Sequence, residues 1–449
     1  MTKKLAIIGL GPGGLGSLKV LLDSLDGPES RLRDNIHIDV FEALSDIGGL
    51  WNYNASISPK APHATMYDNL ETNLHKKLMQ YTDFDFKNVK GNFPTRFEVL
   101  EYLRSYYKEK ILAKHAQKFE VGIVTLHFDS KIIAIERNEE ENTWSLTSGK
   151  GKQFAEYDDL IVSTGHFKQP YFPKKIPGYE DWDKHLPNSL LHSKNYQNPK
   201  LFKDKTVVVV GGSSSGSDIL IQITSTAKVP VIWSVYNPEK NSFPVNPDFT
   251  KKDVGVITNL DYQTRSATFA NGETVKDIDY ILFATGFKYD FNEFKPNALP
   301  PSFKLEKEGK VIKGLYKHLV VADNPTVFFT VLPKNIIPFK LAEVQTSFII
   351  AVIEGRIPQE LIKADDETSL EESLHAFETP ANMEYSNSLY DLVKKYYPAL
   401  FQSFRPTYWE NDIYDHRFRA VAEKFARQET LNKLAVDSRA NNTSYVIPF

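Results

Sequence analysis

The apolar and polar positions of the chain predict two strand-turn-helix units, in residues 4–25 and 205–223. Each starts with a short run of apolar or β-branched residues, turns at glycines, and continues with apolar residues at helical spacing. An apolar strand that ends in Thr-Gly follows each unit, in residues 160–167 and 280–287. This parallel predicts an α/β protein with two Rossmann-like dinucleotide-binding domains, the second inserted into the first.

The same pattern sets the expected domain boundaries. We expect one discontinuous domain in residues 1–169 and 286–449, and an inserted domain in residues 170–285. Residues 170–198 are rich in Pro, Asn, Asp and Lys, and are predicted to connect the two domains. From Asp365 onward we expect a helical tail with many aromatic residues.

The composition narrows the classes of function. Lys and Arg number 54 against 57 Asp and Glu in 449 residues, so neither nucleic acid nor an anionic membrane is a predicted partner. No run approaches the roughly 18 to 20 apolar residues of a transmembrane helix. The chain has no cysteine, which excludes disulfides, thiolate metal sites and redox-active cysteine pairs, and the scattered histidines suggest no metal site.

Gly9, Gly11 and Gly14 form a GxGxxG pattern between the first strand and its helix, and Pro12 and Gly13 complete the turn. The first glycine permits a tight turn, the second lets the backbone approach a pyrophosphate, and the third lets the helix pack on the strand. The helix N-terminus would then face the phosphate charge. The alternative is an ordinary glycine-rich loop.

Glu42 follows the next predicted strand. An acid there can accept hydrogen bonds from the ribose hydroxyls of a dinucleotide. The alternative interpretation of Glu42 is a solvated strand end.

The second turn has Gly211 and Gly216, with Ser213 in place of the middle glycine, followed by Ser214 and Ser215. A dinucleotide can still bind if the Ser213 side chain points away from the pyrophosphate, and a plain packing turn is the alternative. The next strand ends without an acid, which favours NADPH because nothing there repels a 2′-phosphate. Ser234 and Lys240 are the nearest candidates to contact that phosphate.

Seven segments occur in an order that is typical of one enzyme family. They are GLGPGG at residues 9–14, IGGLW at 47–51, MYDNLETN at 66–73, STGH at 163–166, GGSSSG at 211–216, ATGF at 284–287 and LAEVQ at 341–345. By these segments the chain resembles the flavin-containing monooxygenases, a group of class B flavoprotein monooxygenases, and especially their yeast members. The resemblance covers almost the full length.

The fingerprint of that family, FxGxxxHxxx(Y/F), corresponds here to LPNSLLHSKNY at residues 186–196. His192 and Tyr196 fit it, whereas Leu186 and Asn188 replace the usual Phe and Gly. The final tyrosine favours this family over its Baeyer-Villiger relatives, which have tryptophan at that place.

The resemblance implies FAD on the first turn and NADPH on the second. NADPH would reduce the flavin, O2 would add to form a flavin hydroperoxide, and a small sulfur or nitrogen nucleophile (a thiol, thioether or amine) would take an oxygen atom. Baeyer-Villiger or N-hydroxylating chemistry, an uncoupled NADPH oxidase and a non-catalytic redox sensor are the alternatives. A pyridine nucleotide-disulfide reductase would require the absent cysteine pair.

The resemblance also implies roles for single residues. Asn73 corresponds to a catalytic asparagine near the flavin and NADP+, where an amide supplies a donor and an acceptor without charge; a helix cap is the alternative. Gly49, Leu50 and Trp51 would lie along the flavin. Gln345, at a predicted helix start, would donate to the polar edge of the ring or be a surface residue.

The two Thr-Gly pairs would be cofactor ligands or hinge residues where the domains meet: Thr164, Gly165, Thr285 and Gly286. By resemblance the protein is expected to be cytoplasmic, and a peripheral position on the cytosolic face of the endoplasmic reticulum stays open. A homodimer also stays open.

Overall fold

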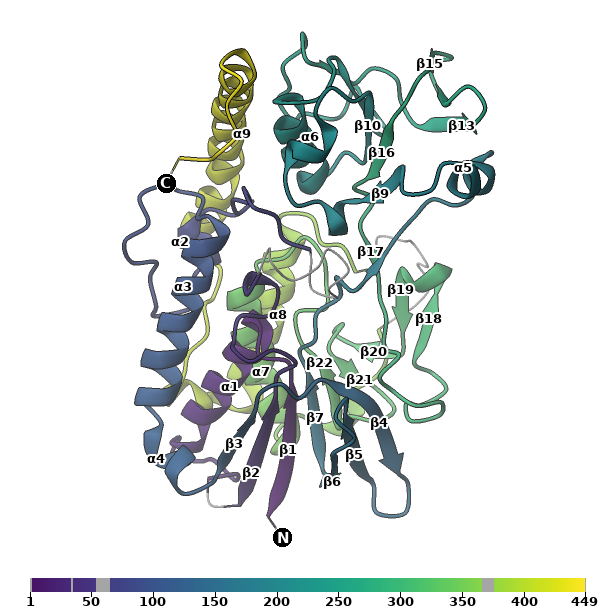
Figure 1. The fold of residues 1–449 in the computed structure, drawn as a ribbon. Coiled ribbons are helices and arrows are strands. Elements are labelled where there is room, and N and C mark those ends of the chain that lie inside the picture. Colours follow the sequence, from purple (N-terminus) through teal and green to yellow (C-terminus); the bar gives the residue numbers. More distant parts are fainter. Residues whose placement is uncertain (1, 34, 54–64, 366–374, 449) are drawn as a thin grey trace.

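The computed structural model describes residues 2–33, 35–53, 65–365 and 375–448. A seven-stranded sheet forms the base of the molecule, in the order β20-β21-β22-β7-β1-β2-β3 (Figure 1). The strands from β22 to β3 are parallel, and β21 and β20 add an antiparallel edge. These strands are β1 (Lys3–Ile8), β2 (Ile36–Phe41), β3 (Val124–His127), β7 (Asp159–Val162), β20 (Leu315–Tyr316), β21 (Val320–Val321) and β22 (Val327–Phe329).

Both faces of this sheet are covered, which explains why β1 is apolar at consecutive positions. Leu5 and Ile7 belong to the core under the helices, whereas Ala6 and Ile8 belong to the core under a second, three-stranded sheet. The covering helices are α1 (Pro12–Leu25), α3 (Arg96–Tyr106) and α7 (Pro338–Ile353), and the covering strands are β4 (Ile132–Asn138), β5 (Thr143–Ser148) and β6 (Gln153–Tyr157).

A separate parallel sheet has five strands in the order β12-β11-β10-β16-β9. Val207 and Val209 face α6 in one core, and Val208 faces the other side. Its strands are β9 (Leu190–His192), β10 (Val207–Val210), β11 (Val231–Ser234), β12 (Thr250–Lys251) and β16 (Tyr280–Phe283), with α6 (Ser214–Thr224) on one face and the hairpin strands β13 (Ile257–Asp261), β14 (Ser266–Phe269) and β15 (Thr274–Val275) nearby. The mixed α/β class is confirmed.

Two chain crossings join the sheets. After β7 the chain forms β8 (Gln169–Pro170), and after β16 it forms β17 (Phe287–Lys288), and these two short strands pair antiparallel. All strands of the five-stranded sheet thus lie between the two crossings. The expected domain boundaries at residues 169/170 and 285/286 fall at this paired crossing.

Residues 170–198 are more than a connection, contrary to the sequence prediction. They contain α5 (Tyr179–His185) and β9, which is an edge strand of the five-stranded sheet. Strand β9 is only three residues long, Leu190–His192, too short for a periodic signal.

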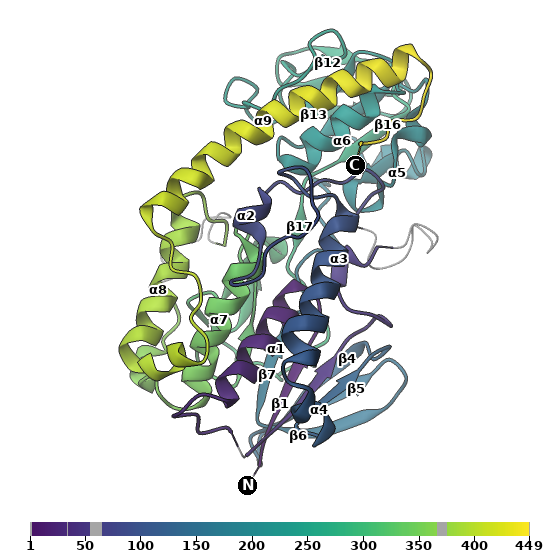
Figure 2. The same cartoon turned by 90° about the vertical axis from the view of Figure 1, so that its left-hand side faces the viewer.

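The tail is helical in its described part, as predicted, with α8 (Ala381–Tyr396) and α9 (Asn411–Ala440); residues 366–374 lie outside the described residues. Figure 2 shows α9 running from the region of α8 up to the five-stranded unit. There Arg439 donates to the carbonyl oxygen of Thr224 at the end of α6. The expected boundaries assign the tail to the first domain alone, whereas α9 also contacts α6 of the five-stranded unit.

Across the described parts of the chain, no helix is both long enough and apolar enough to span a bilayer.

Helices α1 and α7 pack closely because Gly16 has no side chain. A Cβ atom at Gly16 would lie 2.9 Å from the Cβ of Ala342, and one residue on, Ser17 Oγ accepts a hydrogen bond from Thr346 Oγ1 at 3.0 Å. The two helices thus meet at van der Waals contact with little room to separate.

We predict that Gly16→Val lowers the free energy of unfolding by about 2 kcal/mol, because the added methyl groups overpack this contact. Urea unfolding followed by circular dichroism measures the change. Gly91→Val, in an exposed loop with only one atom near the Cβ position, is the control. An unchanged midpoint in Gly16→Val would contradict the contact.

Three buried histidines and the half-buried His318 lie near the paired crossing or in the adjacent part of the first unit. Burial lowers the pKa of His166 to about 3 and the pKa of each of the others, His192, His318 and His375, to about 4. Among the residues that the structure describes, His166 has no hydrogen-bond partner on either ring nitrogen, and it packs against the rings of Phe167 and Tyr289. These imidazoles are therefore neutral in the folded protein at neutral pH.

In the unfolded chain a histidine binds a proton near pH 6.5, whereas folded His166 does so only near pH 3. The stability that neutral His166 contributes is therefore complete above pH 6.5 and is lost as the pH falls. We predict a loss of about 2 kcal/mol from this residue between pH 6.5 and pH 5. Comparing urea unfolding at both pH values should show a shallower pH dependence in His166→Leu than in wild type. His185→Leu, at an exposed position, is the control, and an equal slope in both variants would refute the prediction.

Candidate nucleotide-binding and active site

The first glycine turn joins β1 to α1 through contacts that exclude any side chain. Gly9 has a φ of 99°, and a Cβ there would lie 2.7 Å from the carbonyl oxygen of Ser163. A Cβ on Gly14 would lie 1.9 Å from the carbonyl oxygen of Gly9. Helix α1 begins at Pro12 with Gly11 as its N-cap and no side-chain cap, so its first amide groups stay open for an anion.

The segment with Gly49, Leu50 and Trp51 forms a short 3-10 helix against this turn. A Cβ on Gly49 would lie 2.9 Å from the Cα of Gly11, so the two glycines let their backbones approach closely. Leu50 is half-buried, and Trp51 packs its side chain against the core. The backbones of Gly11 and of residues 49–51 thus lie side by side at the N-terminus of α1.

Glu42 ends β2 beside the turn, as predicted. Its Oε2 accepts a hydrogen bond from the Leu10 N–H at 2.7 Å, and its Oε1 accepts one from the Leu44 N–H at 2.9 Å. Burial raises the pKa of the carboxyl group. Glu42 is therefore not a solvated strand end: it is buried and holds the turn in shape through these two backbone hydrogen bonds.

The second turn repeats the construction of the first. Gly211 has a φ of 124°, and a Cβ there would lie 2.3 Å from the carbonyl oxygen of Ala284. A Cβ on Gly216 would lie 2.1 Å from the carbonyl oxygen of Gly211. Ser213 is the N-cap of α6, and its hydroxyl makes no capping bond.

The serines of the second turn differ in exposure. Ser213 and Ser215 are exposed and Ser214 is half-buried. With no side-chain cap on α6, its first amide groups are open in the same way as those of α1.

Ser234 does not present its hydroxyl to a ligand, contrary to the sequence prediction. The side chain is buried and donates to the carbonyl oxygen of Gly255 at 2.8 Å, while its own carbonyl accepts from the Gly211 N–H. Ser234 therefore shapes the second turn from behind. Lys240, the other candidate, is exposed.

The two Thr-Gly pairs lie at the chain crossings. Thr285 Oγ1 donates to the carbonyl oxygen of Tyr171, and the carbonyl of Gly286 accepts from the Tyr171 N–H and pairs with His192 Nε2. Thr164 Oγ1 lies 3.5 Å from Glu293 Oε1. Both hydroxyls are used in connections between segments, which favours the hinge interpretation over a ligand role.

Both glycine turns lie on the side of their sheets that leads into the paired crossing of β8 and β17. β7 runs parallel to β1, and β16 runs parallel to β10, so each glycine turn lies at the same sheet edge as the following Thr-Gly pair. Since β8 and β17, which follow those pairs, are hydrogen-bonded to each other, the two turns flank the paired crossing. Ligands of parallel α/β sheets bind at such carboxyl ends of strands.

Asn73 is exposed and lies in a bend before the short helix α2 (Lys76–Met79). The cap of that helix is His75, whose Nδ1 accepts from the Lys77 N–H, so the alternative of a capping role for Asn73 is wrong. Its amide is available to a ligand.

Gln345 is neither at a helix start nor on the surface, so both expectations for its position are wrong. It lies in the middle of α7 and is fully buried. Its Oε1 accepts from the Val331 N–H at 2.8 Å, and its Nε2 donates to Tyr385 Oη at 3.0 Å. The amide supports Val331, which has a φ of 57° and whose side chain lies next to Gly13.

Polar residues that were not predicted from the sequence tie the Asn73 segment to α6. The Tyr67 hydroxyl donates to Asp218 in the first half of α6, and Gln222 Nε2 donates to the carbonyl oxygen of Asn69 at 3.0 Å. Tyr196 of the fingerprint donates to Gln222 Oε1 at 3.1 Å. An acid directly before the apolar run of α6, as at Asp218, was the available signal.

Comparison with known proteins places the chain in a family. A family model described as Flavin-binding monooxygenase-like matches residues 2–237, more than half of the chain. The thiol-specific monooxygenase of Saccharomyces cerevisiae is 31% identical over 458 residues, covering 99% of this chain and 98% of the yeast protein. The flavin-containing monooxygenase FMO GS-OX5 of Arabidopsis thaliana is 28% identical, covering 84% of this chain and 79% of that protein.

Among solved structures, the S-allyl-L-cysteine S-oxygenase of Allium sativum superposes with a TM-score of 0.68 at 24% identity, covering 95% of this chain and 99% of that one. This likeness supports the fold, and the resemblance predicted from the seven segments is confirmed. The chain therefore belongs to the flavin-containing monooxygenases, FAD-dependent enzymes whose cofactors are FAD and NADPH.

Proposed function

We propose that this protein is an NADPH- and O2-dependent monooxygenase that oxygenates soft sulfur or nitrogen nucleophiles: thiols, thioethers and amines. FAD binds at the first glycine turn and NADPH at the second. The observation that carries the proposal is that both turns flank one paired crossing, so that two dinucleotides bound there extend toward the same place.

The first turn fits FAD by its shape and its polarity. The close backbones of Gly11 and Gly49 leave room for a pyrophosphate against the open N-terminus of α1. Glu42 lies at the end of β2, where ribose hydroxyls can donate to its carboxylate.

The second turn fits NADPH. The open N-terminus of α6 and the exposed hydroxyls of Ser213 and Ser215 can hold its pyrophosphate. No acid ends β11, so a 2′-phosphate meets no repulsion there, and Lys240 is an exposed cation beyond the strand.

When bound, the flavin supplies the redox chemistry: with electrons from NADPH it activates O2 for transfer of one oxygen atom. The balance is one NADPH, one proton, one O2 and one thioether in, and one sulfoxide, one water and NADP+ out. Asn73, which is neutral and exposed, would hydrogen-bond the oxygen centre without supplying a proton. The thiol-specific activity named for the yeast relative supports sulfur as the preferred nucleophile.

We predict that the purified protein is yellow and oxidises NADPH only with O2, forming about one sulfoxide per NADPH from a small thioether such as methyl p-tolyl sulfide. Absorbance at the flavin and NADPH bands, with product quantified by chromatography, measures this. A colourless protein that does not take up added FAD, or NADPH oxidation that yields only H2O2, would contradict the proposal.

We predict that Asn73→Ala keeps the rate of flavin reduction by NADPH but lowers the sulfoxide formed per NADPH by about tenfold or more, the remainder appearing as H2O2. The physical reason is the loss of the neutral hydrogen-bonding group beside the oxygen centre. Stopped-flow reduction and a peroxidase assay for H2O2 measure the two effects. Asn259→Ala, at an exposed position of β13, is the control, and ordinary coupling in Asn73→Ala would overturn the assignment.

A further inference from the structure

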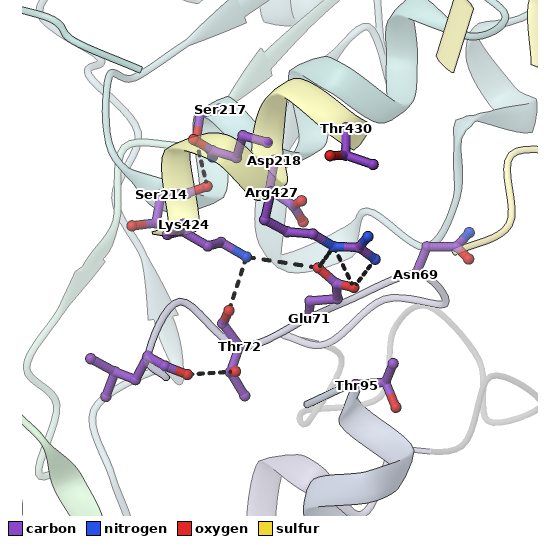
Figure 3. Close-up of polar contacts among 12 residues, drawn as sticks. Asn69, Glu71, Thr72, Thr95, Ser214, Ser217, Asp218, Lys424, Arg427 and Thr430 are labelled. Carbon is purple, nitrogen blue, oxygen red and sulfur yellow. Dashed lines mark hydrogen bonds and ion pairs between the residues drawn. The ribbon is translucent and has the colours of Figure 1, made fainter. Parts of the chain in front are cut away.

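Three segments that are far apart in sequence meet in a buried cluster of polar side chains between the two units. They are the stretch before Asn73, the first half of α6 and the middle of α9 (Figure 3). We name this cluster the polar clamp, and it consists of Tyr67, Glu71, Thr72, Ser217, Asp218, Lys424, Arg427 and Gln428.

Helix α9 holds the stretch that leads to Asn73. Arg427 Nε lies 3.2 and 3.1 Å from the two carboxylate oxygens of Glu71, and its Nη2 also donates to Oε1. Lys424 Nζ donates to the carbonyl oxygen of Thr72 at 2.9 Å and lies 3.9 Å from Glu71 Oε2. Figure 3 shows both side chains reaching from α9 to this stretch.

Helix α6 is fixed in the same cluster. The Tyr67 hydroxyl donates to Asp218, and Gln428 Nε2 of α9 donates to Ser217 Oγ at 3.0 Å. Ser217 Oγ in turn donates to the carbonyl oxygen of Ser214 at 3.1 Å, which is the first residue of α6. Hydrogen bonds therefore run without interruption from Asn73's neighbour, through α9, to the open end of α6.

The charges of the clamp balance but are costly to bury. Two carboxylates, Glu71 and Asp218, face two cations, and the residues Glu71, Asp218 and Lys424 are only 5 to 6% exposed. Burial raises the pKa of Asp218 to about 6, and Lys424 opposes that rise. Buried ion pairs of this kind contribute little net stability compared with apolar residues of the same volume, but they do fix geometry. Stability alone does not account for the cluster.

We propose that Lys424 and Arg427 are positioning residues that hold Asn73 in register with the nicotinamide nucleotide at the start of α6. Thr72, whose carbonyl Lys424 binds, directly precedes Asn73, and Ser217 lies in the first turn of α6. Loosening either contact lets the Asn73 segment and the nucleotide move independently. The inference rests on the proposed function.

Two variants test the clamp without touching either turn or Asn73. Arg427→Gln removes the guanidinium group that donates to both carboxylate oxygens of Glu71. Lys424→Met removes the donor to the Thr72 carbonyl oxygen with little change in side-chain volume. In each we expect H2O2 formed per NADPH to rise about threefold or more, while the rate of flavin reduction at saturating NADPH stays that of wild type. Arg427→Lys keeps the charge but loses the contact of two nitrogens with Glu71. Its H2O2 yield per NADPH should therefore lie between those of wild type and Arg427→Gln.

A second readout does not depend on turnover. In the FAD-loaded protein, amide hydrogen exchange followed by mass spectrometry should accelerate in the peptide spanning residues 67–73 of both variants and stay unchanged in β1 and α1. Titration with NADP+ should show an affinity about threefold or more weaker than in wild type. A purely structural role would instead change exchange throughout α9 and lower the FAD content.

Arg419→Gln, an exposed arginine on the same helix, is the matched control and should behave as wild type. Wild-type coupling, exchange and NADP+ affinity in a folded, flavin-loaded Arg427→Gln or Lys424→Met protein would overturn the proposal. If one of the two variants does not fold, the coupling, exchange and NADP+ affinity of the other variant test the proposal. If wild type itself forms no sulfoxide, the proposed function fails, whereas exchange and NADP+ binding still report on the clamp.

Discussion

The structure depends on one contact that occurs twice: the third glycine of each turn lies directly against the carbonyl oxygen of the first. A Cβ on Gly14 or on Gly216 would lie within about 2 Å of that oxygen, at 1.9 and 2.1 Å respectively, so no side chain fits. The contact fixes the start of the helix on the end of its strand, and with it the direction in which the helix N-terminus points. The carbonyl oxygens of Ser163 and Ala284 pack on the first glycines in the same way, which extends the constraint to a neighbouring strand of each sheet.

From those neighbouring strands the chain continues into β8 and β17, and their pairing brings the two constrained edges together. The crossing alone would leave the units joined on one side only. The stretch from Tyr67 to Thr72 and helix α9 join the units on another side, through these hydrogen bonds and through an apolar cluster in which Leu431 and Ala435 of α9 pack with Ile221 of α6. Polar contacts are directional, so they define a relative orientation more sharply than apolar packing of the same area.

The sequence was sufficient for features that are set by nearby residues. Both glycine turns, the buried strands and the fold class follow from local patterns, because a parallel sheet covered on both faces requires continuous apolar strands. Features satisfied by distant partners were not predictable. Gln345 is bound to Val331 and Tyr385, and Ser234 is bound to Gly255, none of which the local pattern indicates. Helix α9 carries mixed charges with only a weak apolar stripe, so its sequence does not reveal that Lys424 and Arg427 face a buried carboxylate.

The departure of the second turn from GxGxxG has a physical explanation in the same geometry. Ser213 has a φ of −96° and an extended ψ, and Gly11 has a φ of −75°, so neither middle position needs the conformational freedom of glycine. Gly11 and Ser213 differ in the residues that pack beside them. A Cβ on Gly11 would lie 3.4 Å from the Cα of Gly49, whereas Ser213 is exposed. A Cβ at the first turn would already be in van der Waals contact with the Gly49 segment, so a larger side chain there has little room, while the exposed Ser213 side chain at the second turn faces open space. A side chain at the middle position is thus accommodated more readily at the second turn than at the first, where a second backbone segment lies alongside.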